Sequence, residues 1–96
     1  MGASGTSSLD FGTFPGAVDA SVVVTGQGGI LSNSLVEAWI LPADTADHSI
    51  AEHYVDPPNV MAGEIVAGTG FTIRGFPRDG NQIPYYGVWN VAWVWA

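Results

Sequence analysis

Val88-Trp-Asn-Val-Ala-Trp-Val-Trp95, near the C-terminal end of the chain, is the stretch that decides the fold. Side chains alternate between two faces along an extended strand. One face carries Trp89, Val91, Trp93 and Trp95. The other face is also largely apolar, as is typical of a strand covered from both sides. We therefore expect a central strand whose tryptophans pack the core, with a subunit interface or a sugar-stacking platform as the alternatives.

Short runs of β-branched and aromatic residues, separated by Gly and Pro, precede this stretch. No segment longer than a turn or two has apolar residues at helical spacing, so the runs predict strands. These strands cover residues 17–25, 35–41, 60–67, 71–76 and 85–95, with 9–14 as a further edge strand and 77–80 as a turn. The pattern predicts an all-β protein, a small antiparallel β-sandwich or jelly roll of six or seven strands in a single domain. A small barrel is the second choice.

The predicted sandwich spans residues 17–96, and residues 1–16 are assigned to an N-terminal arm that is Gly/Ser-rich at its start. Such termini are usually disordered unless something holds them, and a neighbouring subunit could do so. Phe11 and Phe14 give this arm apolar side chains for such a contact.

Charge is scarce and one-sided in this chain. Of 96 residues, 47% are hydrophobic and only 11% are charged, which is about half the usual charged share. Arg74 and Arg78 are the only basic side chains against nine acidic ones, and the formal net charge is −7. Nucleic acids and anionic membranes are therefore unsuitable partners. The apolar surplus favours an oligomer or a subunit of a larger assembly over a free monomer.

The residue types and motifs of the sequence give little support for a catalytic site. The chain has no cysteine, which excludes disulfides, thiol nucleophiles and Cys-ligated metal sites. It also lacks a G-x-S-x-G elbow and the lysine of a phosphate-binding loop. We expect no enzymatic activity and no cofactor.

Residues 43–56 form a polar, acidic segment that holds both histidines. It could be a loop, a short helix or an edge strand. His48, Glu52 and His53 are weak candidates for metal ligands, because the two histidines are five residues apart and not at the i,i+4 spacing of a zinc helix. A solvated loop with local hydrogen bonds is the preferred interpretation, and a pH-sensitive contact at an interface is the other alternative.

Several stretches together resemble small structural proteins encoded by tailed phages and prophages. They are Leu-Asp-Phe-Gly at 9–12, Ala-Ser-Val-Val-Val-Thr-Gly-Gln at 20–27, Val-Glu-Ala-Trp at 36–39, Thr-Ala-Asp-His at 45–48 with Glu-His at 52–53, Ile-Val-Ala-Gly-Thr-Gly-Phe-Thr-Ile at 65–73, and the closing Trp-rich strand. The resemblance implies a virion component made in the cytoplasm of a bacterial host. It implies no catalytic or ligand-binding residue.

Small size, apolar surplus and acidic balance favour one member of this class, a capsid decoration (cement) protein on the capsid surface. Its expected partners are the major capsid protein and further copies of itself, with a trimer favoured. The alternative is a tail, fibre or baseplate module, which could bind carbohydrate. The candidate partner-binding residues are Phe11, Phe14, Trp39, Trp89, Trp93 and Trp95.

Overall fold

Two antiparallel three-stranded sheets pack face to face in the computed structural model, which describes residues 2–55, 57–77 and 84–96. The elements in chain order are β1 (Ala3–Asp10), β2 (Ala20–Val24), β3 (Val36–Ile40), α1 (Ile50–Val55), β4 (Asn59–Val66), β5 (Gly70–Phe76) and β6 (Val88–Trp95). The prediction of a small all-β sandwich in a single domain is confirmed, with six strands and one short helix in the described residues.

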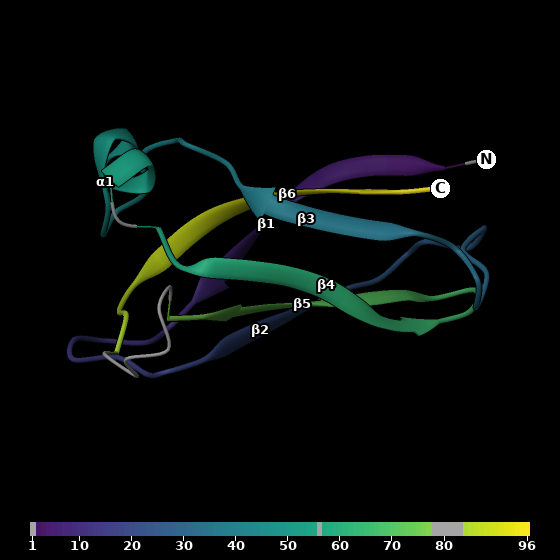
Figure 1. The fold of residues 1–96 in the computed structure, drawn as a ribbon, viewed down its shortest axis with the longest axis horizontal. Coiled ribbons are helices and arrows are strands. Elements are labelled where there is room, and N and C mark those ends of the chain that lie inside the picture. Colours follow the sequence, from purple (N-terminus) through teal and green to yellow (C-terminus); the bar gives the residue numbers. More distant parts are fainter. Residues whose placement is uncertain (1, 56, 78–83) are drawn as a thin grey trace.

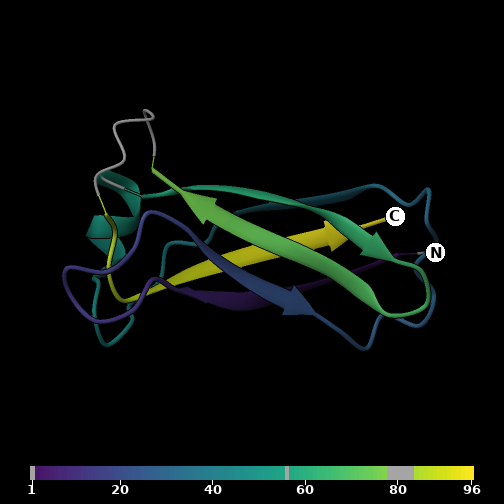
Figure 2. The same ribbon diagram turned by 90° about the horizontal axis from the view of Figure 1, so that it is seen from below.

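The strand order is β1-β6-β3 in one sheet and β2-β5-β4 in the other. Figure 1 shows the two layers edge on, with α1 at one end and both chain termini at the other. Figure 2, seen from below, shows the second sheet crossing in front of β1 and β6. Every strand pairing is antiparallel.

β6 is the central strand of the first sheet, as its two apolar faces predicted. Trp89, Trp93 and Trp95 are buried on its inner face together with Val91, which is fully buried. The register places Leu9 beside Trp89, and Val36 beside Trp95, so the neighbouring strands add apolar side chains to the same face. The two strands that flank β6 therefore contribute to one continuous core.

β5 occupies the equivalent central position in the second sheet. Phe71 and Ile73 are almost completely buried, and Val24 and Val22 of β2 lie beside them in the register. Burying each of these large side chains stabilises the fold by about 1.5 to 3 kcal/mol. Phe71 meets Trp93 of the other sheet edge to face, with ring centroids 5.4 Å apart, and this contact joins the two layers.

Glycine makes room for these rings on the inner faces. A Cβ at Gly5 of β1 would lie 2.6 Å from the indole of Trp93, and a Cβ at Gly75 of β5 would lie 2.8 Å from Leu9 and Phe11. Both contacts are too short for any side chain larger than hydrogen. The Gly in each strand thus sets how closely the aromatic side chains approach the backbone.

The N-terminal segment differs from the expected arm. Residues 3–10 form strand β1, which pairs along its whole length with β6. Only Leu9 and Asp10 of the predicted edge strand over 9–14 belong to it. The error arose because Ser, Thr and Gly indicate a flexible segment locally, whereas β6 offers this segment a complete hydrogen-bonding partner.

The other boundaries agree more closely with the prediction. β2 to β6 overlap the expected runs, although the strands begin later than expected in β2 and β6. The segment 43–56 contains the short helix α1, one of the three structures that the sequence left open. The predicted turn at 77–80 lies outside the described residues, apart from Pro77.

Candidate functional site

Four of the six candidate partner-binding residues belong to the core. Phe11, Trp89, Trp93 and Trp95 are at most 7% exposed. Each indole N–H also has an acceptor within the chain: the Tyr86 carbonyl oxygen for Trp89, Ser7 Oγ for Trp93 and Gln27 Oε1 for Trp95. These rings therefore pack within the subunit, as the core interpretation of this strand predicted, and Trp95 also lines a surface hollow.

Phe14 and Trp39 are the two candidates that reach the surface, with 73% and 45% of their area exposed. They do not form one site. Phe14 lies in the β1–β2 loop, where its ring meets Tyr86 edge on at 5.3 Å between centroids. Trp39 lies on the outer face of β3, opposite Ala92 of β6.

His48 is buried, which corrects the expectation that both histidines lie in a solvated loop. Its Nδ1 lies 3.0 Å from Glu52 Oε2, and its Nε2 lies 2.6 Å from the Tyr86 carbonyl oxygen. The two ring nitrogens thus face a carboxylate oxygen of α1 on one side and a backbone carbonyl oxygen on the other. His48 therefore acts as a clasp between α1 and the segment that leads into β6.

His53 is buried as well, but its partners differ in kind. Its Nδ1 donates to the Ser49 carbonyl oxygen at 2.8 Å, and its Nε2 accepts the Asn90 backbone N–H at 3.2 Å. One nitrogen donates and the other accepts, which is the pattern of a neutral imidazole. Both histidines thus have complete structural roles, joining α1 to β6.

Ser49 and Glu52 cap the first turn of α1 reciprocally. The Glu52 backbone N–H donates to Ser49 Oγ at 3.2 Å, and the Ser49 N–H donates to Glu52 Oε1 at 2.9 Å. This is the capping box S-x-x-E, a sequence signal that could have predicted the helix within residues 43–56. The hydrogen bond from His48, followed by that from the Ser49 N–H, holds the pKa of the Glu52 carboxyl below its ordinary value of 4.5.

The described residues contain no group of three or more His, Cys, Asp or Glu side chains placed to hold a metal ion. The polar atoms of His48, Glu52 and His53 form hydrogen bonds within the chain, either between His48 and Glu52 or with backbone groups. The structure thus does not bring these three weak candidates together as a set of metal ligands.

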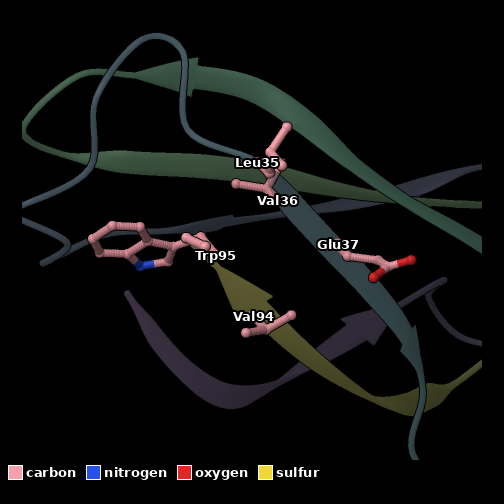
Figure 3. A pocket seen from close by; sticks show the side chains of 6 residues that line it. Leu35, Val36, Glu37, Val94 and Trp95 are labelled. Carbon is pink, nitrogen blue, oxygen red and sulfur yellow. The ribbon is translucent and has the colours of Figure 1, made fainter. Parts of the chain in front are cut away.

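A hollow of about 360 Å³ opens at the end of the sandwich where the termini lie. Its walls are the start of β3 and the end of β6, formed by Leu35, Val36, Glu37, Val94, Trp95 and Ala96. Figure 3 shows Leu35 and Val36 on one wall and Trp95 on another, with the Glu37 carboxylate extending away from them. We call this feature the terminal hollow. Leu35 and Glu37 were not predicted as site residues, because an exposed leucine or glutamate gives no functional signal by itself.

Exposed apolar side chains belong to the terminal hollow and to two neighbouring segments of the chain. Leu35 is 77% exposed at its rim, and Leu31 of the β2–β3 loop and Val66 at the end of β4 are also exposed. The backbone joins these segments, since the Gly68 N–H donates to the Ile30 carbonyl oxygen at 2.8 Å. The terminal hollow therefore combines an exposed leucine with the exposed carboxylate of Glu37.

Arg74 forms an ion pair with Glu64, away from the terminal hollow. Its Nε donates to Glu64 Oε1 at 2.6 Å on the outer face of the second sheet. The pair holds the pKa of Glu64 below its ordinary value and raises that of Arg74. No basic side chain of the described residues contacts Glu37.

Comparison with known proteins gives no relative. No protein-family model, no curated protein and no solved structure matches this chain. Residues 2–55, 57–77 and 84–96 also include no helix with the length and apolar character that crossing a bilayer requires. The fold and its surfaces are thus the grounds on which a function can be proposed.

Proposed function

We propose that this protein is a non-enzymatic virion subunit of a tailed phage, and that it works as a capsid decoration protein that binds the capsid through its terminal hollow. The observation that carries the proposal is the hollow itself, which Leu35, Val36, Val94 and Trp95 line and at which Leu35 is 77% exposed. An apolar hollow with a large exposed side chain beside it favours a surface that a partner covers.

Charge defines the partner that the hollow suits. Glu37 is exposed among apolar neighbours, and the chain carries a formal net charge of −7. A segment that places Lys or Arg against Glu37 and apolar side chains against Leu35 complements both features. An acidic subunit of this kind is attracted to basic patches of a protein lattice and repelled by packaged DNA.

Stabilisation of the capsid follows from mass action. A subunit that binds the assembled lattice and not the free capsid protein lowers the free energy of the assembled state alone. Repetition at every equivalent site of a symmetric lattice multiplies this effect. The rigid β-sandwich suits such a role, because little conformational entropy is lost when a preorganised surface docks.

The structure of the histidine cluster accords with a protein without catalysis. His48 and His53 are buried, and both use each ring nitrogen in holding α1 to the sandwich. A general base needs hydrogen-bond access to a substrate proton. Neither imidazole has such access, so the best titratable candidates of the sequence act in structure.

The direct test is to locate the protein in particles of the virus that encodes it. Cryo-EM and mass spectrometry of separated heads and tails should find many copies on the capsid lattice. Copies on tails alone would replace this proposal with that of a tail, fibre or baseplate module. Absence from both heads and tails would overturn the assignment to the virion.

A matched pair of variants tests the docking surface. Leu35→Asp places a second carboxylate on the rim of the hollow and should abolish binding of the purified protein to heads that lack it. Met61→Asp makes the same change at an exposed apolar residue on the outer face of the second sheet, and should bind like wild type. Equal binding by both variants would show that the terminal hollow is not the contact.

A further inference from the structure

The sandwich has four edge strands, β1 and β3 in the first sheet and β2 and β4 in the second. An edge strand presents unpaired backbone N–H and C=O groups and is a template for another strand. Natural sheets protect such edges with short strands, charges or bulges. The four edges of this protein differ in how far they are protected.

Three of the four edge strands have features that hinder pairing with another strand. β4 has a bulge between Gly63 and Val66, within which Glu64 adopts a positive φ of 55° and pairs with Arg74. β3 is five residues long and has the Glu37 carboxylate near its start. β2 is also five residues long and directly follows Asp19.

β1 has none of these devices over residues 3–9. It runs for eight residues in unbroken register with β6, and its first charged side chain is Asp10, its last residue. It contains no proline. By the measures that natural sheets use, β1 is the edge that is open to another strand.

The hydrogen-bonding direction identifies which residues face outward. Leu35 and Ala96 exchange both backbone hydrogen bonds, so alternate residues of β6 starting at Ala96 bond to β3. Trp95, Trp93, Val91 and Trp89 consequently bond to β1, through Ala3, Gly5, Ser7 and Leu9. The N–H and C=O groups of Ser4, Thr6 and Ser8 therefore point to the free edge.

The free edge of β1 is uncharged, and this matters for pairing with a second copy of the chain. Two copies of a chain with a net charge of −7 repel each other, so they can meet only where each is neutral. The side chains of Ser4, Thr6 and Ser8 are exposed and uncharged. Hydroxyl side chains directly opposite one another in antiparallel strands also attract by hydrogen bonding.

We propose that the edge of β1 is a homodimer interface, at which β1 of a second copy pairs antiparallel across a two-fold axis. The register with Thr6 opposite the Thr6 of the second copy brings Ser4 opposite Ser8 twice, and each of these three pairs forms two backbone hydrogen bonds. The two first sheets then join into one continuous sheet with the order β3-β6-β1-β1-β6-β3. A two-fold dimer replaces the trimer that was favoured from the sequence.

A charge variant tests this interface in the full-length protein. Thr6→Glu places two carboxylates opposite each other on the two-fold axis and should turn the dimer into a monomer in sedimentation equilibrium. Ser32→Glu makes the same change in charge at an exposed loop residue and should leave the dimer unchanged. Circular dichroism of both variants should match wild type, because both side chains are exposed.

Cross-linking supplies a second readout that does not depend on repulsion. Opposite Cα atoms of a hydrogen-bonded antiparallel pair lie about 5.5 Å apart, within the span of a disulfide. The chain has no cysteine, so mild oxidation of Thr6→Cys should give one covalent dimer, and oxidation of Ser32→Cys should not.

The outcomes separate this inference from the proposed function. A wild-type protein that stays monomeric at every concentration, or a Thr6→Glu variant that stays dimeric, overturns the β1 interface. Neither result bears on whether the terminal hollow binds capsids, since that site is tested by Leu35→Asp on purified heads.

Discussion

The imidazole of His48 stacks on the indole of Trp89, with ring centroids 4.0 Å apart and ring planes inclined by 25°. Trp89 belongs to the core strand β6, and His48 precedes helix α1. The stacked pair therefore fastens the helical end of the molecule to its core. It also explains why a histidine in a polar, acidic segment is buried.

Replacing His48 should destabilise the protein substantially. His48→Ala removes the stacking contact and the hydrogen bonds to Glu52 and the Tyr86 carbonyl oxygen, and should cost about 2 to 4 kcal/mol of the free energy of unfolding. Urea denaturation followed by tryptophan fluorescence measures this change. Tyr54→Ala, at an exposed position of the same helix, is the control and should stay within about 0.5 kcal/mol of wild type. Similar losses in both variants would show that the clasp is not what holds α1.

Stability should fall with acid below about pH 4.5, because both Glu52 and Glu64 have a pKa lowered from that ordinary value in the folded protein. The unfolded chain takes up these protons first as the pH falls, so the stabilisation is complete above pH 4.5 and is lost as the pH drops through the folded pKa. Urea midpoints across this range should decline less steeply for Glu52→Gln than for wild type. Glu64→Gln should act in the same direction, and its effect should weaken in high salt because the Glu64–Arg74 pair is exposed. Superimposable curves for all three proteins would contradict the prediction.

A methyl group at Gly5 should disturb the core. Its Cβ would approach the Trp93 indole to 2.6 Å, so Gly5→Ala should cost about 1 to 3 kcal/mol by overpacking. A Cβ at Gly28 meets nothing within 4 Å, so Gly28→Ala should be neutral or slightly stabilising. Thermal unfolding of the two variants gives the comparison, and equal melting temperatures would argue against the packing of β1 over Trp93.

Tryptophan fluorescence should distinguish one exposed indole from three buried ones. Trp39 is half-exposed, and Trp89, Trp93 and Trp95 are buried. Acrylamide should therefore quench one fraction of the emission readily, and Trp39→Phe should remove that fraction. If the variant keeps an easily quenched component, one of the β6 tryptophans reaches solvent and the assignment of this strand to the core is wrong.

Several features of the fold could be read from local sequence. The two-residue period of Val88–Trp95 predicted a covered central strand, and the alternation in Ala20–Val24 and Val36–Ile40 matches their inner and outer faces. The capping box at Ser49 and Glu52 is an equally local signal, and it marks the start of α1. Such signals are reliable because the spacing of side chains along one strand or one helical turn depends on that segment alone.

The candidate site could be predicted only in part. Trp39 and Phe14 reach the surface, but Phe11 and the three tryptophans of β6 do not. Sequence identifies an aromatic residue as a suitable anchor for either a core or an interface, since both bury it. The choice depends on which surface lies opposite, and that surface belongs to distant strands.

The sequence by itself determined the all-β class, the central position of β6, the acidic charge and the absence of cysteine chemistry. Only the tertiary structure decided that residues 3–10 form a strand, because their pairing partner, β6, lies near the other end of the chain. It also decided that His48 is buried and hydrogen-bonded on both ring nitrogens. The Nδ1 partner is four residues away, but the Nε2 partner, Tyr86, is 38 residues away. The physical reason is the same in both cases: periodicity fixes which side of its own segment a residue faces, whereas burial and hydrogen bonding depend on the segments that folding brings opposite it.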